Sequence, residues 1–159
     1  MKHRWKWLLI VCTLGIMGVI FFLSAQPGAT SYSLSERVGN TLQGSDVGRG
    51  IVPKLFSDAV NANVRKWAHV YIYAALGVSM ALTVHTFIRE ATCKLRHPYF
   101  IGIALAILLC FAYAGSDELH QLFVPGRAAL IGDVFIDSLG FLPGVFAASG
   151  LHGLLSHRK

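Results

Sequence analysis

The chain has 159 residues, of which 54% are hydrophobic and only 14% are charged, a balance that excludes an ordinary soluble domain. Its mean hydropathy is +0.56 and its net charge is +6. The basic residues cluster beside apolar runs, where they act as topology signals, so the charge gives no support to nucleic-acid binding. We expect one helical membrane domain that covers residues 1–159.

Four apolar segments approach the length of a membrane-spanning helix, at residues 7–23, 67–84, 98–114 and 134–151. They predict an all-α integral membrane bundle of four transmembrane helices. The first segment follows a basic leader, as the apolar core of a secretory signal peptide does. Its apolar run is longer, however, and cleavage after Ala25 would place the bulky Leu23 where a small residue is preferred. We therefore expect the first segment to be retained.

The long connection between the first two spans, residues 26–63, is rich in Gly, Ser, Thr and Asn. Weakly amphipathic stretches near residues 33–42 and 51–60 predict short helices that lie on the membrane surface. Ser35 is a candidate N-cap for one of them. We interpret the connection as an extracytoplasmic loop that can cover a polar site as a lid.

Lysine and arginine side chains cluster at alternate ends of the spans. Cytoplasmic loops retain such residues, so the clusters predict which end of each span faces the cytoplasm. All three clusters fall on one side of a four-span topology, which predicts that both termini are cytoplasmic. The residues concerned are Lys2, Arg4, Lys6, Arg89, Lys94, Arg96, Arg158 and Lys159.

The connection between the third and fourth spans is too apolar, at residues 119–131, for an ordinary loop in water, and Pro125-Gly126 is a turn signal. We predict a re-entrant or interfacial loop before the fourth span. Irregular backbone at that depth must be buried in protein or line a wet cavity, which indicates a pocket.

Farther along, Gly140 and Gly144 form a Gly-x-x-x-Gly pair that is expected to let a neighbouring helix pack closely.

Polar side chains gather at the span ends that this topology places at the outer face. Ionisable groups in that position cost several kcal/mol unless they are paired, hydrated or bound to a ligand. Ser24 and Gln26 lie at the same level, where the first span ends. The candidate catalytic or binding residues are Lys66, His69, Asp117, Glu118, His120, Gln121, Arg127, Asp133 and Asp137.

Helical spacing predicts which of these side chains meet. Lys66, His69 and Tyr73 are separated by three and four residues, so they share one face of the second span. Asp133 and Asp137 are one helical turn apart, with Asp137 deeper in the membrane. If the third span continues as a helix beyond residue 115, its polar residues at positions 117, 120 and 121 also share a face.

Several short motifs follow one another along the chain: Phe22-Leu23-Ser24-Ala25-Gln26-Pro27, Arg65-Lys66-Trp67-Ala68-His69 with Tyr73 and Gly77, Ser116-Asp117-Glu118-Leu119-His120-Gln121, Pro125-Gly126-Arg127 and Asp133-Val134-Phe135-Ile136-Asp137-Ser138-Leu139-Gly140. Together they resemble the VanZ-like proteins, named for a membrane protein associated with teicoplanin resistance. The resemblance implies a bacterial multi-pass membrane protein of the cell envelope that in some members lowers sensitivity to a lipid-tailed glycopeptide. The family pattern often has Asn at position 137, and residues 28–61 match no part of it.

Three functions remain open for the polar cluster. In the first, Lys66 and Arg127 bind the phosphate or carboxylate of an envelope lipid headgroup or a lipoglycopeptide. In the second, the cluster is an enzyme active site. In the third, Lys66 and Arg127 only neutralise Asp117 and Asp137, so that the helices are held in one register.

The enzymatic interpretation is an intramembrane hydrolase or transferase that acts on phosphate. His69 or His120 would serve as the general base or nucleophile, oriented by Asp117 or Glu118, and Arg127 would stabilise negative charge. The cluster also contains possible ligands for a divalent cation, but no strict metal motif is present and no cofactor is signalled. His85, near the predicted cytoplasmic end, is interpreted as an interfacial side chain.

Overall fold

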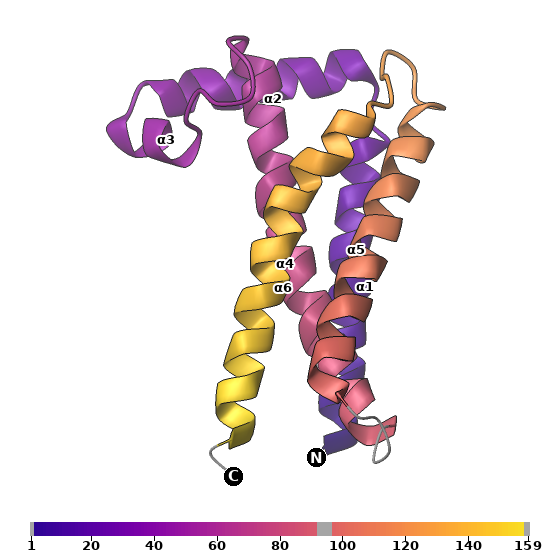
Figure 1. The fold of residues 1–159 in the computed structure, drawn as a ribbon. Coiled ribbons are helices and arrows are strands. Elements are labelled where there is room, and N and C mark those ends of the chain that lie inside the picture. The colour runs from indigo at the N-terminus through magenta and orange to yellow at the C-terminus, as the bar shows by residue number, and fades with distance from the viewer. Residues whose placement is uncertain (1, 92–96, 158–159) are drawn as a thin grey trace.

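The computed structural model describes residues 2–91 and 97–157, which form six helices (Figure 1). Four helices are long: α1 (Lys2–Ser24), α4 (Val60–Ala91), α5 (Pro98–Gln121) and α6 (Ile131–His157). Each contains a stretch long and apolar enough to cross a membrane, at Arg4–Ser24, Val60–Ile88, Pro98–Gln121 and Ile131–Leu155. The all-helical, four-span prediction is therefore confirmed, and the helices extend beyond the predicted apolar segments.

The four long helices run side by side, with the N- and C-terminal ends of the chain at the same end of the bundle (Figure 1). The chain therefore alternates in direction from one long helix to the next. At the opposite end, the last turns of α1 and α5 meet the first turns of α4 and α6. The polar residues predicted from the sequence lie at this end. Of the basic residues that predict the topology, Lys94, Arg96, Arg158 and Lys159 lie outside the described residues.

The core is built around the contact between α4 and α6, the most extensive between any two helices in the described residues. Tyr73 of α4 and Phe141 of α6 are fully buried there. A Cβ atom on Gly140 would lie 2.1 Å from the Val70 carbonyl oxygen, and one on Gly144 would lie 2.4 Å from the Ala74 carbonyl oxygen. The predicted close packing at the Gly-x-x-x-Gly pair is confirmed, because only glycine leaves room for the facing backbone.

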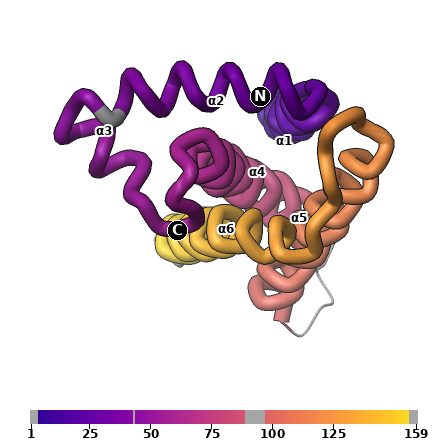
Figure 2. Tube along the Cα trace, turned by 90° about the horizontal axis from the view of Figure 1, so that it is seen from above, coloured from indigo at the N-terminus to yellow at the C-terminus, as the bar shows by residue number. Residues whose placement is uncertain are grey.

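The connection between α1 and α4 contains two short helices, α2 (Gly28–Gln43) and α3 (Asp46–Ile51). Figures 1 and 2 show α2 lying across the polar end of the bundle, beside α1 and α4. The predicted cap at Ser35 is wrong, because α2 begins directly after Pro27 and contains Ser35. Ser45 is the cap that the structure contains: its Oγ accepts a 3.0 Å hydrogen bond from the Gly48 amide at the start of α3. The stretch at residues 52–59, predicted to be helical, has no helix.

His85 differs from its predicted interfacial position. Its side chain is only 3% exposed, and Nε2 lies 2.9 Å from Oγ of Ser149, which links α4 to α6 near the other end of the bundle. The imidazole also stacks on the ring of Tyr99 in α5. Hydropathy gives no signal for this burial, because the direction of the side chain depends on how α4 packs.

Candidate functional site

The polar end of the bundle is assembled from α1, α4, α5, α6 and the loop that joins α5 to α6. Helix α5 continues without a break past Gly115 to Gln121, as the shared-face prediction requires. This continuation carries Asp117, Glu118 and Gln121 into the space between the helices, where all three are buried. The loop at residues 122–130 turns at Gly126, whose φ of 73° favours glycine, and leads directly into α6.

His69 of α4 and Asp137 of α6 form a hydrogen bond across the bundle. Nδ1 of His69 lies 3.0 Å from Oδ1 of Asp137, whose side chain is fully buried. An ionised carboxylate only accepts hydrogen bonds, so Nδ1 carries a proton when Asp137 is charged. The hydrogen-bond partner of this histidine is thus Asp137 and not Asp117 or Glu118, because the packing of α4 on α6 brings Asp137 to it.

Asp117 belongs to a separate hydrogen-bond network that joins α5 to its neighbours. Its Oδ2 accepts from Oγ of Ser24 at 2.8 Å and from Nε2 of Gln121 at 3.2 Å. Gln121 also donates to Oε1 of Glu118 at 3.0 Å, and Oε2 of Glu118 accepts from the Leu130 amide at 3.0 Å. The two carboxylates therefore tie the end of α1 and the α5–α6 loop to α5.

Arg127 in that loop holds the end of α1. Its Nη2 donates to the Leu23 carbonyl at 3.1 Å and its Nε donates to the Gln26 carbonyl at 3.1 Å. These oxygens lie where a helix leaves carbonyl groups without partners inside the helix. Nη1 lies 3.5 Å from Oε1 of Gln121. Burial, followed by the positive charge of Arg65, lowers the pKa of the Arg127 guanidinium.

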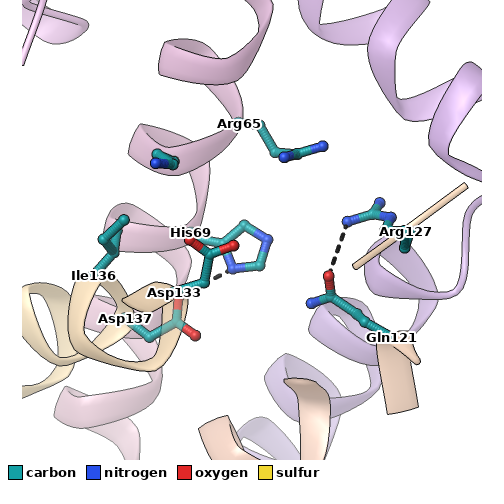
Figure 3. A pocket seen from close by; sticks show the side chains of 8 residues that line it. Arg65, His69, Gln121, Arg127, Asp133, Ile136 and Asp137 are labelled. Carbon is teal, nitrogen blue, oxygen red and sulfur yellow. Dashed lines mark hydrogen bonds and ion pairs between the residues drawn. The ribbon is translucent and has the colours of Figure 1, made fainter. Parts of the chain in front are cut away.

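A cavity lies between these groups (Figure 3), and its empty space, counted together with the space open to the surroundings, is about 260 Å³. In Figure 3, Arg65 extends from α4 toward Arg127 on the other side of the cavity. His69 lies between these two arginines and the carboxylates of α6. The side chains of Arg65 and Lys66 make no hydrogen bond or ion pair with any residue that the structure describes. The cavity is lined by Arg65, Lys66, His69, Gln121, Arg127, Asp133, Ile136 and Asp137.

The structure brings most of the predicted candidates together, although with different roles. Asp117 and Glu118 lie behind the cavity, where they hold other groups rather than face open space. His120 stacks on Phe21 of α1, with ring centroids 4.3 Å apart, and does not line the cavity. Six candidates do line it: Lys66, His69, Gln121, Arg127, Asp133 and Asp137.

Arg65 is the residue that the candidate set omitted. It precedes His69 by four residues, so the helical spacing that selected Lys66 selects Arg65 equally well. Ser24 was recognised as polar and close to the site, but its bond to Asp117 was not predicted.

Within residues 2–91 and 97–157, no group of three or more His, Cys, Asp or Glu side chains could hold a metal ion.

The fold and the site define a multi-pass helical membrane protein with a polar, positively charged cavity at one end of its bundle. The VanZ/LLP1 family model matches residues 9–152, and the chain therefore belongs to the VanZ/LLP1 family. This confirms the resemblance drawn from the sequence motifs. No match is found among curated proteins or among solved structures.

Proposed function

We propose that this protein binds the anionic headgroup of a cell-envelope lipid, or the matching group of a lipoglycopeptide, in the cavity at the polar end of the bundle. The observation that carries the proposal is the convergence of Arg65, Lys66 and Arg127 on one cavity while Arg65 and Lys66 have no ion-pair partner among the described residues. Positive groups held together at the edge of a membrane are costly unless an anion neutralises them.

Arginine suits this role because its planar guanidinium offers two parallel donors to a phosphate or carboxylate. Arg127 is already fixed by the backbone of α1, so it would meet a ligand without losing side-chain freedom. Arg65, on α4, would move toward the ligand and contact its phosphate or carboxylate. Asp133, on the wall formed by α6, would hold Lys66 or a ligand amine.

Lipid retention tests the binding proposal directly. The protein would be purified into nanodiscs that contain equal amounts of an anionic and a zwitterionic phospholipid, and the retained lipid would be identified by native mass spectrometry. We expect preferential retention of the anionic lipid and its loss in Arg65→Ala. Arg37→Ala is the matched control, because Arg37 is exposed on α2 and does not line the cavity. Equal retention by wild type and Arg65→Ala would refute the proposal.

The effect on antibiotic sensitivity is a separate part of the proposal. We expect expression in a susceptible Gram-positive host to protect against teicoplanin, which carries a lipid tail, more than against vancomycin. At matched membrane levels, Arg65→Ala should remove the protection and Arg37→Ala should keep it. Protection by Arg65→Ala at the wild-type level would show that resistance does not depend on this site. If no form protects, a resistance role for this chain is excluded.

An enzymatic role in phosphate chemistry is a second proposal, favoured by the His69–Asp137 hydrogen bond. With Nδ1 held by Asp137, Nε2 of His69 can take a proton from water as its oxygen bonds to phosphorus. The ester P–O bond would break, the proton would pass to the departing alkoxide, and Arg65 and Arg127 would stabilise the charged phosphoryl oxygens. Release of inorganic phosphate from a lipid phosphate monoester, lost in His69→Gln while lipid retention persists, would support this role. Absence of release from the wild type would exclude it for such esters.

A further inference from the structure

A second cavity lies directly beside the site, between α1, α2 and α4, and its empty space, counted together with the space open to the surroundings, is about 540 Å³. Arg65, His69 and Arg127 line both cavities, so the second opens where the positive charges converge. Its remaining lining residues are Ile20, Leu23, Ser24, Gln26, Ser31, Leu34, Ser35, Ala68 and Ile72.

The walls change from charged to apolar along the direction of the spans. Ile20 lies one helical turn deeper than Ser24 in α1, and Ile72 lies about two turns deeper than Arg65 in α4. Leu34 of α2 covers the cavity from the third side. The space therefore has a positively charged end at Arg65 and Arg127 and an apolar end farther along the spans, which matches the two parts of an anionic lipid.

We infer that this second cavity holds an aliphatic chain of an anionic phospholipid whose phosphate lies at Arg65 and Arg127. The inference rests on the proposed headgroup binding and extends it to the whole lipid molecule. A chain gains little hydrophobic free energy on moving from the bilayer into the cavity, because both surroundings are apolar. The headgroup therefore decides which lipid binds, and the cavity fixes the orientation of the bound lipid.

Photocrosslinking in nanodiscs tests where the chain lies. Two probes would carry the same diazirine in the half of one acyl chain nearer the headgroup, one with the phosphatidic acid headgroup and the other with phosphatidylcholine. Labelled peptides would be mapped by mass spectrometry. We expect the anionic probe to label the cavity wall at Ile20, Leu23 or Ile72 about tenfold more than the zwitterionic probe does, which corresponds to one charge-assisted contact. Labelling of the outward face of α5 should be equal for the two probes.

A pair of tryptophan substitutions separates the cavity from the rest of the lipid-facing surface. Ala68→Trp places a large side chain on the cavity wall, whereas Ala104→Trp places the same side chain on an exposed position of α5. We expect Ala68→Trp to lose the cavity labelling and Ala104→Trp to keep it. Arg65→Ala should also lose the preference for the anionic probe. This second variant removes a positive charge without filling the cavity, so it tests the headgroup contact separately.

Equal labelling of the cavity by both probes would overturn the inference, and so would unchanged labelling in Ala68→Trp. A third probe would be a lipoglycopeptide that carries the diazirine in its lipid tail. Labelling of the cavity by this probe but not by the anionic lipid would also overturn the inference. Failure of this inference can be told apart from failure of the proposed function. If the anionic lipid is retained through Arg65 but its chain labels only the outer surface, headgroup binding stands and the chain site fails; if the anionic lipid is not retained, both fail.

Discussion

Nδ1 of His69 and Oδ1 of Asp137, 3.0 Å apart, form the ion pair or hydrogen bond that joins the two most closely packed helices beside the cavity. Asp137 is fully buried, so its carboxylate has no access to bulk water. Its Oδ2 has no hydrogen-bond partner among the described residues, which makes His69 its main compensation. A buried group that loses such a partner costs more than the bond itself contributed.

The first prediction follows from this pair. Asp137→Asn keeps an oxygen that can accept a hydrogen bond from Nδ1 of His69, so the free energy of unfolding should fall by less than about 1 kcal/mol. Asp137→Leu leaves His69 without that acceptor, and the fall should be about 1–3 kcal/mol. Thermal unfolding in detergent, together with the level of each variant in the membrane, measures the difference. Equal stability of the two variants would show that the pair contributes little to the fold.

The second prediction separates the two arginines. Arg127→Lys loses the planar fork that reaches the Leu23 and Gln26 carbonyls, so the free energy of unfolding should fall by about 1–2 kcal/mol. Arg65→Ala removes no hydrogen bond or ion pair within the described residues, and stability should stay within about 0.5 kcal/mol. Unfolding of both variants, measured without added anionic lipid, tests this. A large loss in Arg65→Ala would indicate that Arg65 supports the fold instead of a ligand.

The sequence predicted the fold through length and hydropathy, because a chain in lipid must satisfy its backbone within helices. The four spans and the polar end followed from that rule. The true helix ends lie farther out, since backbone hydrogen bonding continues across polar residues once a helix has started. Helix α4 begins at Val60 for this reason, although its apolar run starts at residue 67.

The pairing of the polar side chains could not be predicted in the same way. Local periodicity places a residue on a face of its own helix but does not say which neighbouring helix that face meets. His69 meets Asp137 because glycines at positions 140 and 144 bring α6 against α4. The role of Arg127 was also hidden, because the carbonyl groups that it binds at the end of α1 are present in every residue and carry no sequence signal.

The third prediction concerns the α4–α6 contact. A Cβ atom on Gly77 would lie 2.3 Å from the carbonyl oxygen of Phe141, and backbone at that distance cannot simply move aside. Gly77→Ala should therefore destabilise the protein by about 1–3 kcal/mol, as overpacking of a core does. Gly150→Ala is the control in α6, because nothing lies within 4 Å of the position that its added methyl group would take. If the two variants melt at the same temperature, the helices are not held at this contact.

The fourth prediction tests the orientation in the membrane. In a chain with its cysteines replaced by serine, Val47→Cys on α3 and His97→Cys before α5 lie at opposite ends of the bundle, and both positions are exposed. The positive-inside rule places the end that contains Val47 outside the cell. A membrane-impermeant maleimide should therefore label Val47→Cys in intact cells, and label His97→Cys only after the membrane is opened. The reverse pattern would put the positively charged cavity on the cytoplasmic leaflet, where it could meet anionic lipids of the inner surface but not a glycopeptide outside the cell.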